Sequence, residues 1–219
     1  QPDSHDWLIQ LMEGVEDIPG AALAEGIEWN WETFPEYLDA LEKMPRVMDI
    51  ATQVPHGSVR AYVMGERGAR NEDPTADDLI AMAQIVQEGI EAGALGFTSS
   101  RTMLHRALDG EPVPGTFAGA EELIAMGKAV ADAGGGVVEV ASDIGLGGLE
   151  GNFGSDIDWM RALANDYGLT VTYALNQADR HPQQWRELLE LSSAPIDGDG
   201  KVIAQVAGRP AGLLFGLET

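Results

Sequence analysis

The chain has 219 residues and a mass of 23.3 kDa, enough to bury one sizeable hydrophobic core or two small ones. Its 13 Lys and Arg residues against 36 Asp and Glu residues give a net charge of −23, so the overall field repels phosphate and excludes nucleic acid and anionic membranes as partners. No apolar run approaches the roughly 20 residues that span a bilayer, and we expect a soluble, cytoplasmic protein. The absence of cysteine excludes a thiol nucleophile and thiolate metal ligands.

The N-terminal half carries the signals of three helices. Apolar side chains at helical spacing over residues 7–15 predict the first helix. A capping box that begins at Thr33 predicts a second helix, which ends at Pro45. A similar start at Thr75 predicts a long third helix, and Gly93 is its expected C-terminal residue in the left-handed conformation.

Short apolar segments, each followed by polar residues, predict five parallel strands. They cover residues 47–54, 94–97, 136–141, 169–175 and 202–206. The last two intervals between strand starts are 33 residues each, close to the roughly 31 residues per unit of a (β/α)8 barrel. Strands that are apolar throughout are buried on both faces, as in a parallel sheet flanked by helices. The expected fold class is therefore α/β, part of a (β/α)8 TIM barrel with about five parallel strands.

Chemistry in such folds collects where the strands end, because the loops there meet on one face. The candidate residues at these positions are His56 and Arg60 after the first strand, Ser99, Arg101 and His105 after the second, Asp143 after the third, and Asn176 and Gln177 after the fourth. In so acidic a chain, this gathering of positive groups predicts a pocket for an anionic group such as a carboxylate. Arg60 or Arg101 could bind it bidentately.

Each candidate also has a simpler interpretation. His56 could be a loop residue bonded to backbone, and His105 could belong to a solvated surface. Asp143 could be a general base or a helix cap. The sequence has no His-x-His, no His-Glu-x-x-His and no histidine within a predicted strand, so no set of metal ligands can be assembled from it.

Several segments in order resemble the N-acyl-D-amino-acid deacylase (D-aminoacylase) branch of the amidohydrolase superfamily. They are residues 31–38 (WETFPEYL), 54–60 (VPHGSVR), 91–101 (EAGALGFTSSR) and 114–118 (PGTFA), the last followed by 121–123 (EEL). The resemblance is strongest over residues 29–123. It implies an amidohydrolase barrel and zinc-assisted hydrolysis of an N-acyl amide to a free D-amino acid, with an Asp moving the proton.

Within this family interpretation, we expect His56 and Asp143 to be catalytic. We expect a small-molecule substrate, bound by Arg60, Ser99, Arg101, His105, Asn176 and Gln177. Where the family has metal-binding histidines, the chain reads VEVASD over 138–143 and YALNQ over 173–177, without histidine. Zinc is thus expected from the resemblance, while no residue of this sequence is predicted to bind a metal.

Five strands cannot close an eight-stranded barrel, so residues 1–219 are expected to form the central part of a barrel domain. The remainder of the polypeptide or a second copy of the chain would then be the macromolecular partner. Two other interpretations stay open. The first is a noncatalytic binding or assembly protein on an amidohydrolase scaffold that has lost its metal ligands. The second is a complete open α/β sheet with a crevice where the strand order switches.

Overall fold

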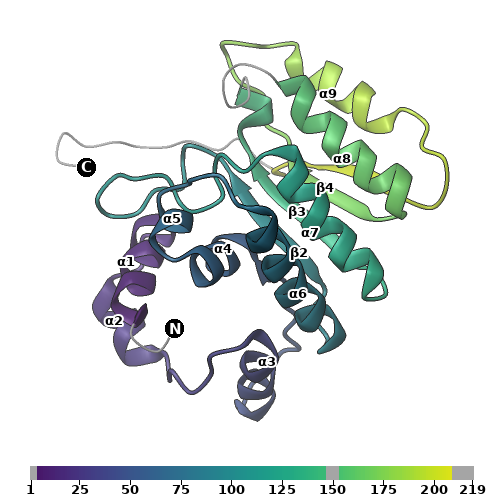
Figure 1. Ribbon diagram of the computed structural model, residues 1–219. Coiled ribbons are helices and arrows are strands. Elements are labelled where there is room, and N and C mark those ends of the chain that lie inside the picture. Colours follow the sequence, from purple (N-terminus) through teal and green to yellow (C-terminus); the bar gives the residue numbers. More distant parts are fainter. Residues whose placement is uncertain (1–3, 147–152, 209–219) are drawn as a thin grey trace.

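The computed structural model describes residues 4–146 and 153–208, and it shows one parallel sheet with helices packed along it (Figure 1). The helices are α1 His5–Glu16, α2 Gly20–Gly26, α3 Phe34–Lys43, α4 His56–Met64, α5 Glu66–Ala69, α6 Ala76–Glu91, α7 Ala120–Asp132, α8 Phe153–Tyr167 and α9 Gln184–Ser193, with a 3₁₀ turn η2 at Asp143–Leu146. The strands are β1 Val54–Pro55, β2 Gly96–Arg101, β3 Val137–Ser142, β4 Thr170–Ala174 and β5 Lys201–Gln205.

The strands lie side by side in the order in which they occur in the chain, β1-β2-β3-β4-β5, and all are parallel. Parallel crossovers are right-handed, so an order that never reverses places the connecting helices on the same face of the sheet. This is the winding of a barrel. An open doubly wound sheet needs a reversal, and the five described strands contain none. The expected fold class, an α/β arrangement with five parallel strands and flanking helices, is confirmed.

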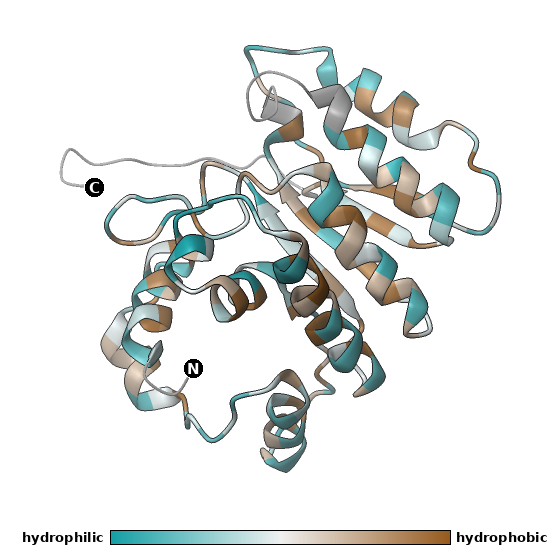
Figure 2. Cartoon of the chain, in the orientation of Figure 1, coloured by the Kyte–Doolittle hydropathy of each residue, from teal (hydrophilic) through white to brown (hydrophobic). Residues whose placement is uncertain are grey.

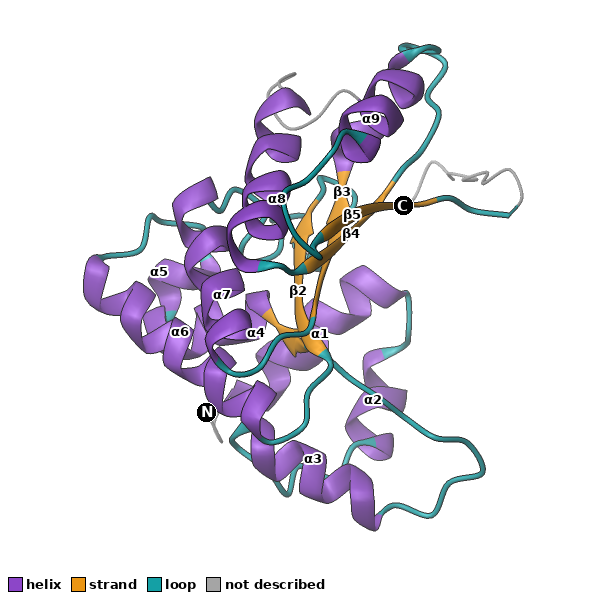
Figure 3. Ribbon diagram, turned by 90° about the vertical axis from the view of Figure 1, so that its right-hand side faces the viewer, coloured by secondary structure: helices purple, strands orange, loops and turns teal. Residues whose placement is uncertain are grey.

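Alternation along the strands separates a covered face of the sheet from an uncovered one. Phe97, Val138, Val171 and Tyr173 are at most 1% exposed and pack against the helices. Figure 3 shows α6, α7 and α8 together on this covered side, and Figure 2 shows hydrophobic residues gathered where helices and strands meet. The other face carries solvent-exposed side chains such as Glu139.

Capping interactions fix the starts of two predicted helices. In α3 the Thr33 hydroxyl accepts the Glu36 N–H at 3.3 Å, and the Glu36 carboxylate accepts the Thr33 N–H at 2.9 Å. Thr75 and Asp78 form the same reciprocal pair at the start of α6. Both predicted helix starts are confirmed, because each box satisfies backbone N–H groups that the first helical turn leaves without partners. None of the described helices has the length and apolarity that crossing a membrane requires.

Replacing Asp78 with alanine is expected to cost about 1 kcal/mol of folding free energy at neutral pH, through loss of the cap. Hydrogen bonds from the Arg67 guanidinium, at 2.7 Å, and from the Thr75 N–H lower the pKa of Asp78 from 3.8 to about 2. Its contribution is therefore complete above pH 3.8 and is lost as the pH falls toward 2. Urea denaturation at pH 7 and pH 3 measures it. The exposed neighbour Asp77, also changed to alanine, is the control, and equal losses in both variants would contradict the prediction.

Two local predictions around β1 are wrong. A strand was expected over 47–54, but only Val54 and Pro55 pair with β2, while Val47 and Met48 are 101% and 74% exposed. Apolar residues alone do not make a strand when no neighbouring strand accepts their backbone hydrogen bonds. His56 was expected in a loop, and it instead begins helix α4 directly after Pro55.

The end of β2 also differs from expectation, because Ser99 and Arg101 were placed after this strand and belong to it. Both are in register with β3, with Ser99 opposite Val140 and Arg101 opposite Ser142. This polar end can be part of the sheet because the Ser99 and Arg101 side chains both have hydrogen-bonding partners on the covered face.

Candidate active site

His56 lies in a buried polar cluster between the sheet and helix α7. Its Nδ1 is 2.8 Å from the Ser99 Oγ, and its Nε2 is 2.8 Å from a carboxylate oxygen of Glu122. The imidazole packs against the Phe97 ring and is 1% exposed. Both ring nitrogens therefore have hydrogen-bonding partners within the protein, and His56 connects β2 to α7.

Arg60 completes this buried polar cluster, which we define as His56, Arg60, Ser99 and Glu122. One guanidinium nitrogen donates to both Glu122 oxygens, at 2.7 and 2.6 Å, and another donates to the Glu72 carbonyl oxygen. Both charged side chains are 2% exposed. Burial raises the pKa of Glu122, but the hydrogen bond and charge of His56 and the charge of Arg60 outweigh it, and the pKa lies below its ordinary value.

Arg101 is paired on the same covered face, further along the sheet. Its guanidinium lies 3.0 Å from a carboxylate oxygen of Asp156, the acidic residue in the first turn of α8, and also donates to the Ala118 carbonyl oxygen. The same Asp156 oxygen accepts the Trp159 indole N–H at 3.2 Å. Arg60 and Arg101 were expected to share a pocket for an external anion, and the structure instead engages each guanidinium with a carboxylate from a helix.

The segment 102–119, between β2 and α7, is anchored at both ends and carries His105. At its start, the Asp143 carboxylate accepts hydrogen bonds from the Thr102 hydroxyl and, at 2.7 Å, from the Met103 N–H. Near its end, Asn71 accepts the Gly115 N–H at 2.8 Å. Asp143 therefore holds this segment at the carboxyl end of the sheet.

Two other candidate residues, Asn176 and Gln177, follow β4 and are exposed to solvent. Their position is fixed by the preceding residue, because the Leu175 N–H donates to the Gln205 carbonyl oxygen of β5 at 2.9 Å. Both amides can donate and accept hydrogen bonds, as a substrate carboxylate or amide requires.

The structure thus divides the predicted site residues into groups. His56, Arg60 and Ser99 come together in the buried polar cluster, and Arg101 pairs separately with α8. His105 and Asp143 belong to the anchored segment 102–119 and its support, whereas Asn176 and Gln177 lie exposed past β4. Among these groups, the hydrogen bond from the Arg101 guanidinium to the Ala118 carbonyl oxygen joins Arg101 to segment 102–119. The catalytic and substrate-binding roles stay predictions.

Glu122 is a member of the cluster that the sequence places within a segment of the family resemblance but does not predict as a site residue. The signal that could have found it is spacing, since Glu122 lies four residues before Met126 and eight before Val130, on the buried stripe of α7. A carboxylate at such a position needs a buried partner, and the cations of residues 56–60 supply it.

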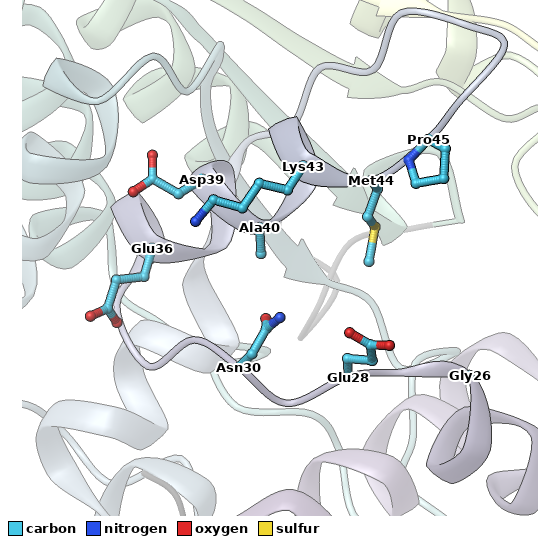
Figure 4. A pocket seen from close by; sticks show the side chains of 9 residues that line it. All are labelled: Gly26, Glu28, Asn30, Glu36, Asp39, Ala40, Lys43, Met44 and Pro45. Carbon is cyan, nitrogen blue, oxygen red and sulfur yellow. The ribbon is translucent and has the colours of Figure 1, made fainter.

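Two cavities lie near the N-terminal helices. The larger, of about 950 Å³, is bounded by α1, α3, α4 and β1, and its wall includes the aromatic residues Trp7, Trp29, Trp31, Phe34, Tyr37 and Tyr62. The smaller, of about 380 Å³, lies between residues 26–30 and α3, with Glu28 and Asn30 facing this helix across it (Figure 4). Neither is lined by residues of β2 to β5. The larger cavity reaches Pro55 at the end of β1 and Ser58 and Val59 of α4, but His56 and Arg60 do not line it.

The sequence matches a known protein family. The profile described as "Amidohydrolase family" matches residues 2–214, nearly the whole chain. The chain belongs to the amidohydrolase family. Two similar proteins are an uncharacterized protein of Mycobacterium bovis, 29% identical over 49% of this chain, and a D-aminoacylase of Alcaligenes xylosoxydans xylosoxydans, 30% identical over 42%. This amidohydrolase chain spans only 19% and 18% of their lengths.

Solved structures similar to this amidohydrolase chain are also D-aminoacylases. One is a variant in complex with copper chloride, and another concerns the binuclear metal centre of D-aminoacylase. Each is 21% identical and aligns with a TM-score of 0.59 over 80% of this chain and 33% of its own length. At this identity the likeness supports the barrel fold, and it agrees with the strand order found here.

The described residues of this amidohydrolase chain do not fit a metal ion. No three His, Cys, Asp or Glu side chains come together in the parts of the chain that the structure describes. At the end of β3, Asp143 uses its two carboxylate oxygens on Thr102 and Met103. Directly past β4, Asn176 and Gln177 are neutral amides, which are poor ligands for zinc. We therefore derive no chemical step through a metal.

Proposed function

We propose that the complete protein hydrolyses the amide bond of N-acyl-D-amino acids or of related N-acyl compounds. The observation that carries the proposal is the family match over residues 2–214 on a sheet wound like a barrel. The D-aminoacylase among the similar proteins supports the substrate class. Zinc, expected from the resemblance, would need ligands other than those described here, and residues 1–219 would be the central part of the barrel domain.

The side chains divide between substrate contact and support of the sheet. We assign substrate contact to His105, Asn176 and Gln177, which lie at the carboxyl ends of β2 and β4. The buried polar cluster and the Arg101–Asp156 pair lie on the helix-covered face of the sheet and support it, because they join strands to helices. Asp143 acts by holding residues 102–103 in place.

A panel of N-acetyl-D-amino acids and their L enantiomers tests the proposal. We expect the purified protein to release free D-amino acid, measured by an amine-specific assay, and to release less of the L form. The assay is repeated after dialysis against a chelator and after return of zinc. No release from any member of the panel, with or without added metal, would contradict the proposed function.

The second candidate function is a noncatalytic binding or assembly protein on the same scaffold. It is favoured by the pairing of Arg60 and Arg101 with helix carboxylates. The amides of Asn176 and Gln177, directly past β4, also favour it. It predicts ligand binding without turnover and no stoichiometric metal. Elemental analysis of the purified protein separates the two, because about one zinc per chain supports hydrolysis and its absence supports binding alone.

A further inference from the structure

The segment that precedes β1 is apolar and exposed. Val47, Met48 and Ile50 are 101%, 74% and 54% exposed. Figure 3 shows the connection from α3 to β1 as a loop that stands away from the neighbouring helices. One exposed apolar side chain is ordinary on a protein surface, but three within four residues beside a sheet indicate a surface that another element covers. We call residues 47–53 the edge segment.

The backbone of the edge segment also has few partners. Within the described part of the chain, its one backbone hydrogen bond joins the Thr52 carbonyl oxygen to the Leu95 N–H at 2.9 Å. Alternate residues of a strand direct their backbone groups to opposite sides, so Ala51 and Gln53 face away from β2. On that side no described strand lies next to β1. Such unpaired backbone groups are the binding surface for a further strand.

The larger cavity lies along this same edge. Residues 52–55 form part of its wall, together with α3 and α4. The aromatic rings of the wall form a continuous row, because Trp31 lies 5.8 Å from Trp29 and 5.2 Å from Tyr37, measured between ring centroids. At about 950 Å³ the cavity has room for several large side chains. Apolar side chains that entered it would be buried against apolar surface, which is favourable in proportion to the area.

The charges of the cavity wall restrict what enters it. Its charged side chains are Glu32, Glu66 and Glu88, and no Lys, Arg or His is among the described residues that line it. The Tyr62 hydroxyl donates to a Glu32 carboxylate oxygen at 3.1 Å. A further carboxylate in the cavity would be repelled by these charges and would find no cation. The occupant is therefore apolar and carries no acidic side chain at this place.

We propose that a strand of the complete polypeptide, outside residues 1–219, pairs in parallel with the edge segment and fills the aromatic cavity with its side chains. This inference rests on the proposed function in one respect, namely that residues 1–219 are the central part of a barrel domain. Pairing extends back from Pro55, which has no backbone N–H to offer. The chain spans 19% and 18% of the lengths of two similar proteins, which contain ample further polypeptide for such a strand.

Two other occupants fit the same observations less well. Two copies related by a two-fold axis would pair their β1 edges antiparallel, whereas every described pair in this sheet is parallel. A small molecule in the cavity would leave the backbone groups of Ala51 and Gln53 without strand partners. A parallel strand satisfies the backbone and the cavity together.

Hydrogen exchange of the complete protein, followed by mass spectrometry, tests the pairing. The amides of residues 49–53 are expected to exchange at least about 100-fold more slowly than in an unstructured chain, because paired strand amides exchange only when the pairing opens. The amides of residues 97–101 in β2 are the reference for a paired strand. Exchange over 49–53 at the unstructured rate, with slow exchange in β2, would overturn the proposal.

A photoreactive phenylalanine analogue in place of Ile50 identifies the partner. Ile50 shares the face of Thr52 and Val54 by strand alternation, and both of those residues line the cavity. We expect a crosslink within one molecule to an apolar segment outside residues 1–219 that has no Asp or Glu. The same analogue at Ile80, 67% exposed on α6, is the matched control and is expected to form no such crosslink.

Three crosslinking results would contradict the proposal. They are a crosslinked dimer, crosslinks confined to residues 1–219, and the absence of any crosslink at position 50 while a small molecule is retained in the native mass spectrum. The first would assign the edge to a second copy, and the last would assign the cavity to a ligand.

The assay with N-acyl-D-amino acids separates this inference from the proposed function. Turnover by a complete protein in which residues 49–53 exchange freely would overturn the inference and leave the proposed function intact. Slow exchange and the expected crosslink, without turnover of any substrate in the panel, would overturn the proposed function and leave the strand pairing intact.

Discussion

Replacing Glu122 with alanine is expected to destabilise the protein by about 3–5 kcal/mol, the cost of leaving a buried charge without its partner. The Glu122 carboxylate contacts Arg60 through both oxygens and also the His56 Nε2, and all three side chains are at most 2% exposed. Without it, the guanidinium of Arg60 keeps only the Glu72 carbonyl as a named acceptor. Equilibrium urea denaturation measures the loss.

The matched control for this substitution is Glu121→Ala, one residue earlier on the exposed side of α7. We expect it to change the free energy of unfolding by less than about 0.5 kcal/mol, as surface substitutions do. Similar losses in the two variants would show that the helix start, rather than the buried ion pair, is being measured. Glu122→Gln keeps the shape and removes the charge, and it is expected to fall between the wild type and Glu122→Ala.

The same carboxylate gives the stability a defined pH dependence. Since the pKa of Glu122 is lowered from 4.5 in the folded protein, the unfolded chain takes up its proton first as the pH falls. The contribution of Glu122 is therefore complete above pH 4.5 and is lost as the pH falls through the folded value. Part of the acid destabilisation of the wild type is expected to be absent in Glu122→Gln, and identical pH profiles would contradict this.

Replacing Gly96 with alanine is expected to destabilise the protein by about 3 kcal/mol, at the upper end of the cost of overpacking. Gly96 begins β2 opposite Val137 of β3, and a Cβ there would meet the Val137 carbonyl oxygen well inside van der Waals contact. Because the obstacle is backbone in the middle of the sheet, no rotamer change relieves it. Thermal unfolding followed by circular dichroism measures the effect.

Gly26→Ala is the control for this second substitution. Gly26 is the last residue of α2, and a Cβ there would have open space around it. Alanine favours helix over glycine, so we expect no loss of stability. A loss at Gly26 as large as at Gly96 would indicate a general sensitivity to added methyl groups and would contradict the steric argument.

The elements best predicted from the sequence are those with local causes. The capping boxes at Thr33 and Thr75 and the apolar segments of β3 and β4 depend on neighbours within a few residues, and the structure confirms them. The first strand was predicted too long because strand formation depends on a partner distant in the sequence. Val47, Met48 and Ile50 have apolar side chains, but none of them pairs with β2.

The site was harder to predict than the fold. Side chains alternate between the two faces of a strand, but the sequence pattern does not indicate which face the helices cover. Ser99 and Arg101 were expected at a common mouth, and both point toward the helices. Ser100, between them, is polar at the same strand end but was not predicted as a site residue, although it contacts His105. Glu122 was missed because its partners, His56 and Arg60, are more than 60 residues away in the chain.

The order of the strands has a consequence for handling the protein in solution. β5 is the last of the described strands in the sheet, and no described strand pairs with its outer side. Its uncovered face carries Ile203, 43% exposed, between Lys201 and Gln205. An unpaired strand edge can pair with a strand of another molecule. The Lys201 ammonium disfavours such pairing, because it would have to lose its hydration. In the proposed barrel domain, a strand from the remainder of the polypeptide would pair with this side of β5.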